Sequence, residues 1–183
     1  MNAPAYAAAQ LLVAGRWRAG RHAVTHAVVD PATGRTLDHL GLASAQDIEQ
    51  ALQAADKGFA NWRDVPAQER CARLERGVAR MRERQEAIAL LLTMEQGKPL
   101  AEARAECAMA AELIEWYAQE ARRIYGRVIP ARQPGSRMSV LKQPVGPVAA
   151  FAPWNFPLVL SARKLGGALA AGCSIILKGA EET

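Results

Sequence analysis

The sequence predicts an α/β protein in which helices and a β-ribbon arm precede the start of a parallel sheet. Two observations predict this class. Apolar residues recur at helical spacing between residues 44 and 125, and residues 147–178 alternate between an apolar strand, a helix rich in Ala and Gly, and a second apolar strand. Because strand, helix and strand follow one another within about thirty residues, we expect parallel strands joined by a right-handed crossover.

Composition narrows the class of protein further. The chain has 183 residues, of which 50% are hydrophobic and 22% charged, which argues against a disordered chain and a coiled coil. The net charge is +5, but the basic residues between positions 63 and 84 alternate with Glu69, Glu75 and Glu83, as on a solvated helix face. We therefore expect no nucleic-acid partner.

Cysteine spacing and prolines indicate the compartment. The three cysteines are far apart and form no CxxC pair or Cys/His cluster, so we expect no disulfide, no metal site and a reducing, cytoplasmic location. The uncharged run 143–162 holds four prolines, which disfavours a membrane-spanning helix. Residues 1–14 lack the basic start of a secretory signal.

The first forty residues read as short strands and turns, followed by helices. Residues 11–17 are predicted as one strand of a hairpin, and residues 30–34 (Asp-Pro-Ala-Thr-Gly) as a turn. Ser44 is a predicted N-cap, with Asp47 completing a partial capping box. The helix that follows places these apolar residues on one face: Ile48, Ala51, Leu52, Ala55, Phe59 and Trp62.

Two more helices and a ribbon are expected next. One helix is predicted from Pro66, in its first turn, to Gln96, with Gly97 just beyond its end. A third runs over about residues 100–125. Residues 128–130 and 138–142 are predicted strands around a loop at 132–136.

The last forty residues spell the strand–helix–strand unit. The predicted strands cover residues 148–152 and 174–178, and the helix covers residues 158–171, with Gly172 as its stop. Two strands are not a complete doubly wound sheet, so we expect the chain to be the truncated front part of a larger, Rossmann-like protein.

Ligands of open α/β sheets bind beyond the carboxyl ends of the strands. Neither strand end contains GxGxxG, the usual dinucleotide fingerprint. Trp154 offers a flat wall and Asn155 a neutral amide donor, while Lys178 and Glu181 offer hydrogen bonds to ribose hydroxyls. From the residues alone, this is a nucleotide-like crevice with one amide donor beside it.

At these residues the chain resembles the aldehyde dehydrogenase superfamily, over nearly the whole sequence from about Leu11. The motifs that carry the resemblance are Phe-Ala-Pro-Trp-Asn-Phe-Pro at 151–157, Arg-Lys-Leu at 163–165, Ala-Leu-Ala-Ala-Gly-Cys at 168–173 and Lys-Gly-Ala-Glu-Glu-Thr at 178–183, with Asp-Pro-Ala-Thr-Gly at 30–34 and Glu-Gln-Gly-Lys-Pro at 95–99 upstream. Within the superfamily it looks most like the NAD(P)-dependent succinate-semialdehyde dehydrogenases.

The resemblance implies a division of the chain. Residues 1–125 would be the helical N-terminal part of the cofactor-binding domain, residues 126–143 an oligomerisation ribbon, and residues 144–183 the first, incomplete strand–helix–strand unit of the NAD-binding domain. The implied reaction oxidises an aldehyde to the acid, with hydride passing to NAD(P)+, in a homo-oligomer without a membrane partner.

Site residues follow from the matching motif positions. Asn155 resembles the donor that stabilises the tetrahedral oxyanion, and Lys164 a lysine near the reaction centre. The residues that look like cofactor contacts are Phe151, Ala152, Pro153, Trp154, Lys178 and Glu181. Each has a plainer alternative: Asn155 as an N-cap, Lys164 as a solvated helix residue, the strand end as buried packing, and Lys178 with Glu181 as a solvated pair.

Two departures from the family pattern bear on activity. Gly179 stands where the family usually has Pro, which loosens the loop beside Lys178. The family's nucleophilic Cys and general-base Glu lie downstream of this chain, and we expect none of Cys71, Cys107 and Cys173 to replace the nucleophile. The chain alone should therefore not dehydrogenate aldehydes, and a catalytically inactive remnant that binds at most nucleotide or a sister subunit stays an alternative.

Arg163 and Glu181 indicate the substrate and the cofactor. Arg163 lies eight residues after Asn155, on a similar helix face, and a guanidinium there would bind a carboxylate on the substrate. This favours succinate semialdehyde first and glutarate semialdehyde second, unless Arg163 pairs with an acidic neighbour. A carboxylate at Glu181 favours NAD+ over NADP+, although Lys178 would tolerate the extra phosphate.

Overall fold

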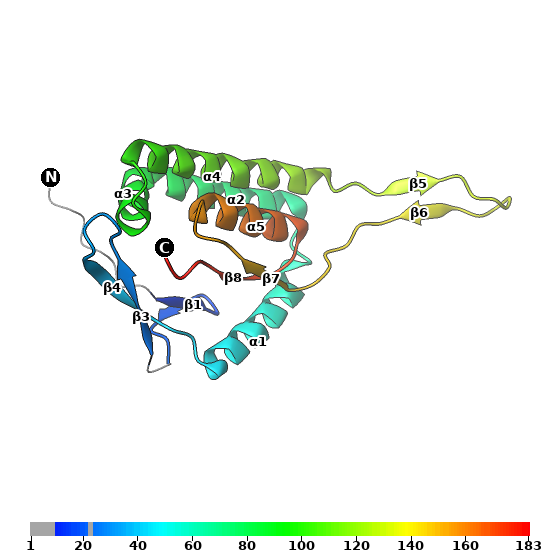
Figure 1. The fold of residues 1–183 in the computed structure, drawn as a ribbon. Helices are drawn as coiled ribbons and strands as arrows, with labels where there is room; N and C mark the ends of the chain where they lie inside the picture. The colour runs from blue at the N-terminus through cyan, green and yellow to red at the C-terminus, as the bar shows by residue number, and fades with distance from the viewer. Residues whose placement is uncertain (1–9, 22–23) are drawn as a thin grey trace.

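Residues 10–21 and 24–183 are described by a computed structural model, in which two β-hairpins are followed by a run of helices, a β-ribbon and a strand–helix–strand unit (Figure 1). Residues 1–9, most of the segment in which no secretory signal is predicted, lie outside this description. Within the described ranges, no helix is both long and apolar enough to cross a membrane. The expected α/β class is confirmed.

The N-terminal strands form two antiparallel hairpins. β1 (Leu11–Val13) pairs with β2 (Arg16–Arg18), so the assignment of residues 11–17 to a single strand is wrong. The connection is a two-residue turn in which Ala14 (φ 52°) and Gly15 (φ 73°) both have positive φ, as tight hairpins require. Gly15 is a typical turn residue, but alanine, as at Ala14, rarely has a positive φ, so the sequence did not predict a turn here.

The second hairpin contains the turn that the sequence predicts. β3 (Thr25–Val29) pairs with β4 (Thr36–Gly41), and Asp30 organises the connection. Its carboxylate accepts hydrogen bonds of 2.8 Å from the backbone N–H of Ala32 and from Oγ1 of Thr33. The turn is thus held by its own first residue.

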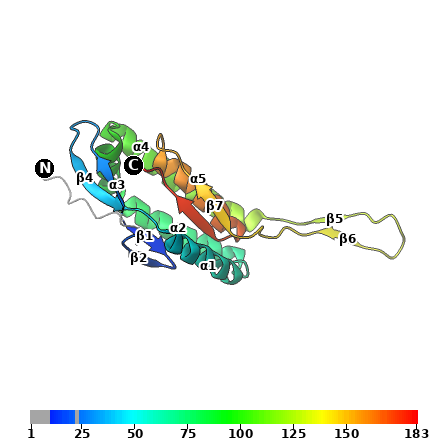
Figure 2. The same cartoon turned by 60° about the horizontal axis from the view of Figure 1, so that its bottom comes forward.

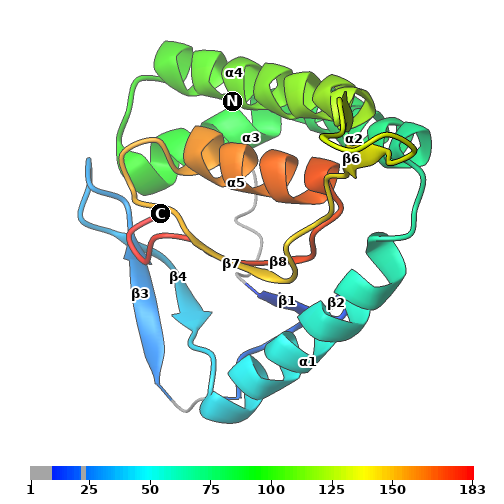
Figure 3. The ribbon, with the colours of Figure 1, turned by 90° about the vertical axis from the view of Figure 1, so that its right-hand side faces the viewer.

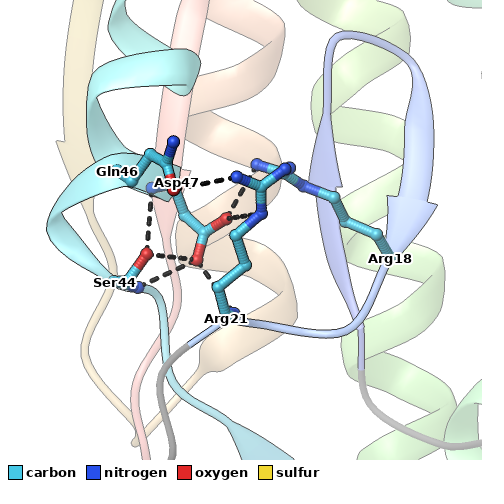
Figure 4. A network of polar contacts seen from close by, with 5 residues as sticks. All are labelled: Arg18, Arg21, Ser44, Gln46 and Asp47. Atoms are coloured by element: carbon cyan, nitrogen blue, oxygen red, sulfur yellow. Dashed lines mark hydrogen bonds and ion pairs between the residues drawn. The ribbon is translucent and has the colours of Figure 1, made fainter.

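A buried carboxylate fastens the N-terminal segment to helix α1 (Ala45–Trp62). Ser44 and Asp47 form the full capping box, and Asp47, only 1% exposed, also accepts a 3.0 Å hydrogen bond from the N–H of Arg21 and pairs with Arg18 at 2.9 Å (Figure 4). The hydrogen bonds from the backbone N–H groups of Arg21 and Ser44 lower the pKa of Asp47 to about 2.

Helix α1 buries less of its apolar face than its periodicity predicts. Ala55 is buried and Phe59 and Trp62 are half-buried, but Ile48 and Leu52 are exposed. Periodicity finds the face, but the partner decides how much of it is covered. Here β8 (Ile175–Lys178) contacts the helix, and Ser174, which precedes β8, donates a 2.6 Å hydrogen bond to the carbonyl of Ala55.

The single helix predicted from Pro66 to Gln96 is two helices. α2 (Ala67–Glu83) and α3 (Gln85–Gln96) meet at Arg84, whose φ of −105° and ψ of 8° break the helix without any Gly or Pro. Pro66 is the N-cap residue and lies outside the first turn.

Helix ends marked by glycine lie where the sequence predicts them. Gly97 caps α3 with φ 77°, a left-handed conformation that favours glycine. α4 (Leu100–Glu120) follows after a short corner and passes into a 3₁₀ turn, Ala121–Arg123, so the third predicted helix ends before residue 125.

The ribbon leaves the body of the molecule as a long arm. β5 (Arg127–Ile129) pairs antiparallel with β6 (Met138–Val140), and all six residues are exposed. In two views the arm extends well beyond the helices (Figures 1 and 2). The rest of the described molecule therefore covers neither face of the ribbon.

The predicted strand–helix–strand unit is confirmed. β7 (Val148–Phe151) and β8 (Ile175–Lys178) are parallel, and α5 (Pro157–Ala171) connects them. α5 lies between α4 and the strand pair, with α1 on the other side of the strands (Figure 3). Ala110, Val159 and Ala162 are the buried residues of the core between α4 and α5, and larger, partly buried side chains such as Leu113 and Ile114 pack against them.

Gly166 allows α5 to approach α4 closely. A Cβ at Gly166 would lie 2.9 Å from Cδ2 of Tyr117, which is too close for an ordinary contact. At the next position, Gly167, the nearest atom of the same ring would be 3.5 Å away. The close approach therefore depends on Gly166 in particular.

Candidate functional site

The candidate site lies beyond the carboxyl ends of β7 and β8. The register pairs Phe151 with Lys178, and the N–H of Ala152 donates a 3.0 Å hydrogen bond to the carbonyl of Lys178. Both strands end at this point. The segment after β7 continues into α5, and the segment after β8 continues into residues 179–183. The structure thus brings the two predicted groups of site residues to one edge.

The loop between β7 and α5 presents large side chains to solvent. Phe151 is 68% exposed and Trp154 57% exposed, whereas Ala152 is buried. Trp154 also lines a hollow of about 480 Å³ together with residues of β3 and the end of α3. Exposed aromatic faces beside a hollow suit the stacking of a flat ring.

Asn155 is exposed in the middle of this loop and does not cap the helix. Phe156 occupies the N-cap position and Pro157 is the first helical residue, so the N-cap alternative for Asn155 is wrong. Because Asn155 precedes the helix, helical spacing does not relate it to Arg163, and that step of the sequence argument is also wrong. The amide of Asn155 is accessible to a ligand.

Lys178 and Glu181 interact with each other. Nζ of Lys178 lies 2.9 Å from Oε1 of Glu181, and both side chains are about half exposed. The hydrogen bond from Lys178 lowers the pKa of Glu181 and so favours its ionised form. This geometry fits the plainer alternative of a solvated pair, and both charged groups stay accessible at the sheet edge that carries the aromatic side chains.

The two basic residues of α5 differ in burial. Arg163 is exposed and Lys164 is half-buried. Within residues 10–21 and 24–183, no acidic side chain forms an ion pair with Arg163. The guanidinium is therefore available to an anionic group from outside the described chain.

Three residues that contact the loop or the start of α5 were not predicted as site residues from the sequence: Gln96, Lys98 and Glu106. Gln96 donates to the carbonyl of Trp154, and Glu106 accepts hydrogen bonds from the first turn of α5 while pairing with Lys98. Glu106 had one detectable mark, because it is the only acidic residue among otherwise apolar buried positions of α4. Nothing in the sequence indicated that the backbone N–H of Leu158, 52 residues away, would bind Glu106.

The cysteines are poorly suited to act as nucleophiles. Cys71, Cys107 and Cys173 are all free and buried. Burial raises the pKa of the thiols of Cys71 and Cys107, which disfavours the reactive thiolate.

The fold and the site define a class: an open α/β sheet with aromatic, amide and charged groups beyond adjacent carboxyl strand ends. The sequence model of the aldehyde dehydrogenase family matches residues 17–183. The chain belongs to the aldehyde dehydrogenase family.

Curated relatives and a solved structure agree with this assignment. The chain is 69% identical over 183 residues to 4-(hydroxymethyl)benzenesulfonate dehydrogenase of Comamonas testosteroni, covering 100% of this chain and 38% of the relative. It is 47% identical over 174 residues to glutarate-semialdehyde dehydrogenase of Pseudomonas putida, covering 95% and 36%.

The crystal structure of succinate-semialdehyde dehydrogenase from Burkholderia pseudomallei superposes with a TM-score of 0.95 at 43% identity, covering 100% of this chain and 38% of that one. The chain thus spans little more than a third of the length of the relatives it matches.

Proposed function

We propose that this chain forms the cofactor-facing N-terminal part of an NAD(P)+-dependent dehydrogenase that oxidises an aldehyde bearing an anionic group. The observation that carries the proposal is the exposed loop of Trp154 and Asn155 beside the Lys178–Glu181 pair at one sheet edge. In this proposal residues 1–125 support the cofactor site, residues 126–143 join subunits, and residues 144–183 bind the cofactor.

Asn155 and Lys164 take the catalytic roles. The Asn155 amide donates a hydrogen bond to the oxyanion that forms on the aldehyde carbon, and Lys164 lies close to the reacting groups. Preorganised donors of this kind lower a barrier by about 3–4 kcal/mol, because the negative charge develops only in the transition state. The exposure of Asn155 supports the role, since a substrate must reach it.

The cofactor lies against the β7–α5 loop. Phe151, Ala152, Pro153 and Trp154 form its wall, and Lys178 with Glu181 holds the adenosine ribose. We propose a preference for NAD+, because the ionised Glu181 repels a 2′-phosphate and accepts hydrogen bonds from a 2′-hydroxyl. A higher kcat/KM with NADP+ than with NAD+ would contradict the preference.

Arg163 binds the anionic group of the substrate. Relatives named for 4-(hydroxymethyl)benzenesulfonate, glutarate semialdehyde and succinate semialdehyde are all named for compounds with a sulfonate or carboxylate. Arg163 is exposed on α5, where a guanidinium can form two parallel hydrogen bonds to either anion. Succinate semialdehyde is the first expected substrate and glutarate semialdehyde the second.

The experiment uses a joined enzyme, defined as residues 1–183 of this chain followed by the remaining part of the Comamonas testosteroni relative. NAD(P)H formation is measured with succinate semialdehyde, glutarate semialdehyde, 4-sulfobenzaldehyde and butyraldehyde. We expect the three anionic aldehydes to be preferred. A folded joined enzyme that oxidises none of the four, while the unaltered relative is active, would contradict the proposal.

Arg163→Leu tests the substrate assignment. The variant should lose roughly ten- to a hundredfold in kcat/KM with succinate semialdehyde, because a charge-assisted contact contributes about 1.5–3 kcal/mol. Butyraldehyde keeps the four-carbon chain without the charge and should be unaffected. Equal losses with both substrates, or none with either, would exclude anion binding by Arg163.

The exposed ribbon supports assembly into a homo-oligomer, because β5 and β6 leave Val128 and Met138 uncovered. A cytoplasmic location agrees with three free cysteines. The oligomeric state of the joined enzyme, measured by light scattering with and without Val128→Lys, tests the assembly. A variant that assembles as well as the parent would contradict it.

A further inference from the structure

The corner between α3 and α4 reaches across to both sides of Asn155. We propose that Gln96, Lys98 and Glu106 are positioning residues that hold the β7–α5 loop so that the Asn155 amide is aimed at the reacting oxygen. The inference rests on the proposed role of Asn155 and deepens it, by naming what fixes a donor that lies on an exposed loop.

The residue before Asn155 is bound through its backbone. The side-chain amide of Gln96, the last residue of α3, donates a hydrogen bond to the carbonyl of Trp154. The side chain of Trp154 itself is largely exposed, so this backbone contact fixes the loop where side-chain packing does not.

The residue after Asn155 is bound through its ring. Nζ of Lys98 lies 4.7 Å from the ring centroid of Phe156, within the range of a cation–π contact. The same ammonium pairs with Glu106, and its side chain is only 11% exposed. Lys98 thus links the loop to the interior of the helical layer.

Glu106 then fixes the start of α5. Its Oε1 accepts hydrogen bonds from the backbone N–H groups of Leu158 (3.0 Å) and Val159 (3.2 Å). The N-cap residue, Phe156, has no side-chain oxygen, so the helix lacks a cap of its own and takes one from α4. A carboxylate there also complements the positive end of the helix dipole.

Glu106 is 2% exposed, and a charge so deeply buried is costly unless partners surround it. It receives two backbone N–H groups and the ammonium of Lys98. Together the three residues hold positions 154, 156, 158 and 159, while Asn155 between them forms no hydrogen bond within the described residues. The arrangement fixes the backbone on both sides and leaves the amide free.

The position of the Asn155 amide affects catalysis, because a displacement of a reacting group by about 1 Å can cost on the order of a hundredfold in rate. Losing the positioning residues should therefore lower kcat, because the Asn155 amide is no longer aimed at the reacting oxygen. The effect should also disappear when Asn155 is absent, since no amide is left to aim. A purely structural role predicts losses that add.

The experiment is a double-mutant cycle in the joined enzyme. Gln96→Leu and Glu106→Gln are each made alone and together with Asn155→Ala, and kcat, KM and the Kd for NAD+ are measured. Glu106→Gln keeps the size of the side chain, and Gln96→Leu leaves no buried charge without a partner. Glu102→Gln, an exposed carboxylate one turn earlier on α4, is the matched control.

We expect each single variant to lose roughly ten- to thirtyfold in kcat, and less than twofold once Asn155→Ala is present. Glu102→Gln should match the parent. Additive losses, or a single-variant loss below threefold in a folded enzyme, would overturn the inference. If Asn155→Ala alone has no effect, the proposed role of Asn155 fails first, so the two failures are distinguishable.

A second pair of variants, at Lys98, keeps the inference testable if Glu106→Gln does not fold. Lys98→Arg keeps the cation that pairs with Glu106 and faces Phe156, whereas Lys98→Met removes it. We expect Lys98→Arg to retain most of kcat and Lys98→Met to lose it. Equal activity of the two variants would contradict the role of Lys98.

Discussion

At the C-terminal end of α5, side chains from other helices bind the last carbonyl groups and cover them. Arg70 donates to the carbonyl of Ala170 (3.1 Å), and Trp62 Nε1 donates to that of Leu169 (2.9 Å). Arg70 also donates to the carbonyl of Val65, which lies between α1 and α2. Gly172 and Cys173, which follow the helix, are buried. At the N-terminal end Glu106 binds the first N–H groups just as closely, yet Trp154 and Asn155 in the preceding loop are exposed.

Each end of the helix thus carries the charge that complements its dipole, an anion at the start and a cation at the finish. Only the loop at the start is open. The two ends of the helix therefore differ in what they contribute. The closed end contributes stability, and the open end exposes the side chains of Trp154 and Asn155 on a backbone held by Gln96 and Glu106. Variants at the closed end should therefore change melting temperature without changing kcat.

The largest expected loss of stability follows from Arg70→Met. Removing the guanidinium leaves two carbonyls without their donor, and each costs about 1–3 kcal/mol when buried. We expect a total of about 2–4 kcal/mol, seen as a lower melting temperature of the joined enzyme. Arg76→Met, an exposed arginine on the same helix, is the control. A change in kcat with unchanged melting temperature would break the comparison.

Gly166→Ala tests the packing between the two ends. The new methyl group would meet the ring of Tyr117, so we expect a loss of about 1–3 kcal/mol. Gly167→Ala has room and should be neutral or stabilising by up to about 1 kcal/mol, because Ala favours helix. Thermal melts of the two variants provide the measurement. If both behave alike, the close approach of α4 and α5 is not what limits this position.

Ser174→Ala probes the closed end more gently. It removes the 2.6 Å hydrogen bond to the carbonyl of Ala55, and a typical hydrogen bond contributes about 1 kcal/mol. Ser161→Ala on α5 is the control, since the side-chain hydroxyl of Ser161 forms no hydrogen bond within the described residues. We expect a small drop in melting temperature for Ser174→Ala alone. Equal drops would assign the effect to helix or strand propensity.

Asp47 sets a pH-dependent part of the stability. Its pKa falls from 3.8 to about 2 on folding, so its contribution is present above pH 3.8 and is lost as the pH falls toward 2. The melting temperatures of the parent and Asp47→Asn should differ at neutral pH and converge in that range. Asp56→Asn, exposed on α1, should leave the parent's curve unchanged. A gap that widens in acid would contradict the assignment.

The features that the sequence predicts correctly are local ones. The Ser44–Asp47 capping box, the Gly97 and Gly172 helix ends and the strand–helix–strand unit all depend on residues a few positions apart. The break at Arg84 has no Gly or Pro to announce it. The exposure of Ile48 and Leu52 depends on which elements cover α1, and periodicity does not contain that information.

The candidate site divides in the same way. Motif positions brought Trp154, Asn155, Lys178 and Glu181 to attention, and the parallel pairing of β7 and β8 places them at one edge. Glu106 lies on a helix 52 residues before its partner Leu158. Its interaction with the start of α5 is purely tertiary, so only the folded structure reveals it.

The most direct test of the central claim, that the β7–α5 loop supplies the oxyanion donor, is the kcat of Asn155→Ala in the joined enzyme. The matched control is Asn61→Ala, an exposed asparagine on α1. We expect kcat with succinate semialdehyde to fall by roughly a hundred- to a thousandfold, with melting temperature and the Kd for NAD+ unchanged. A loss of less than tenfold in a folded, cofactor-binding enzyme would contradict the claim.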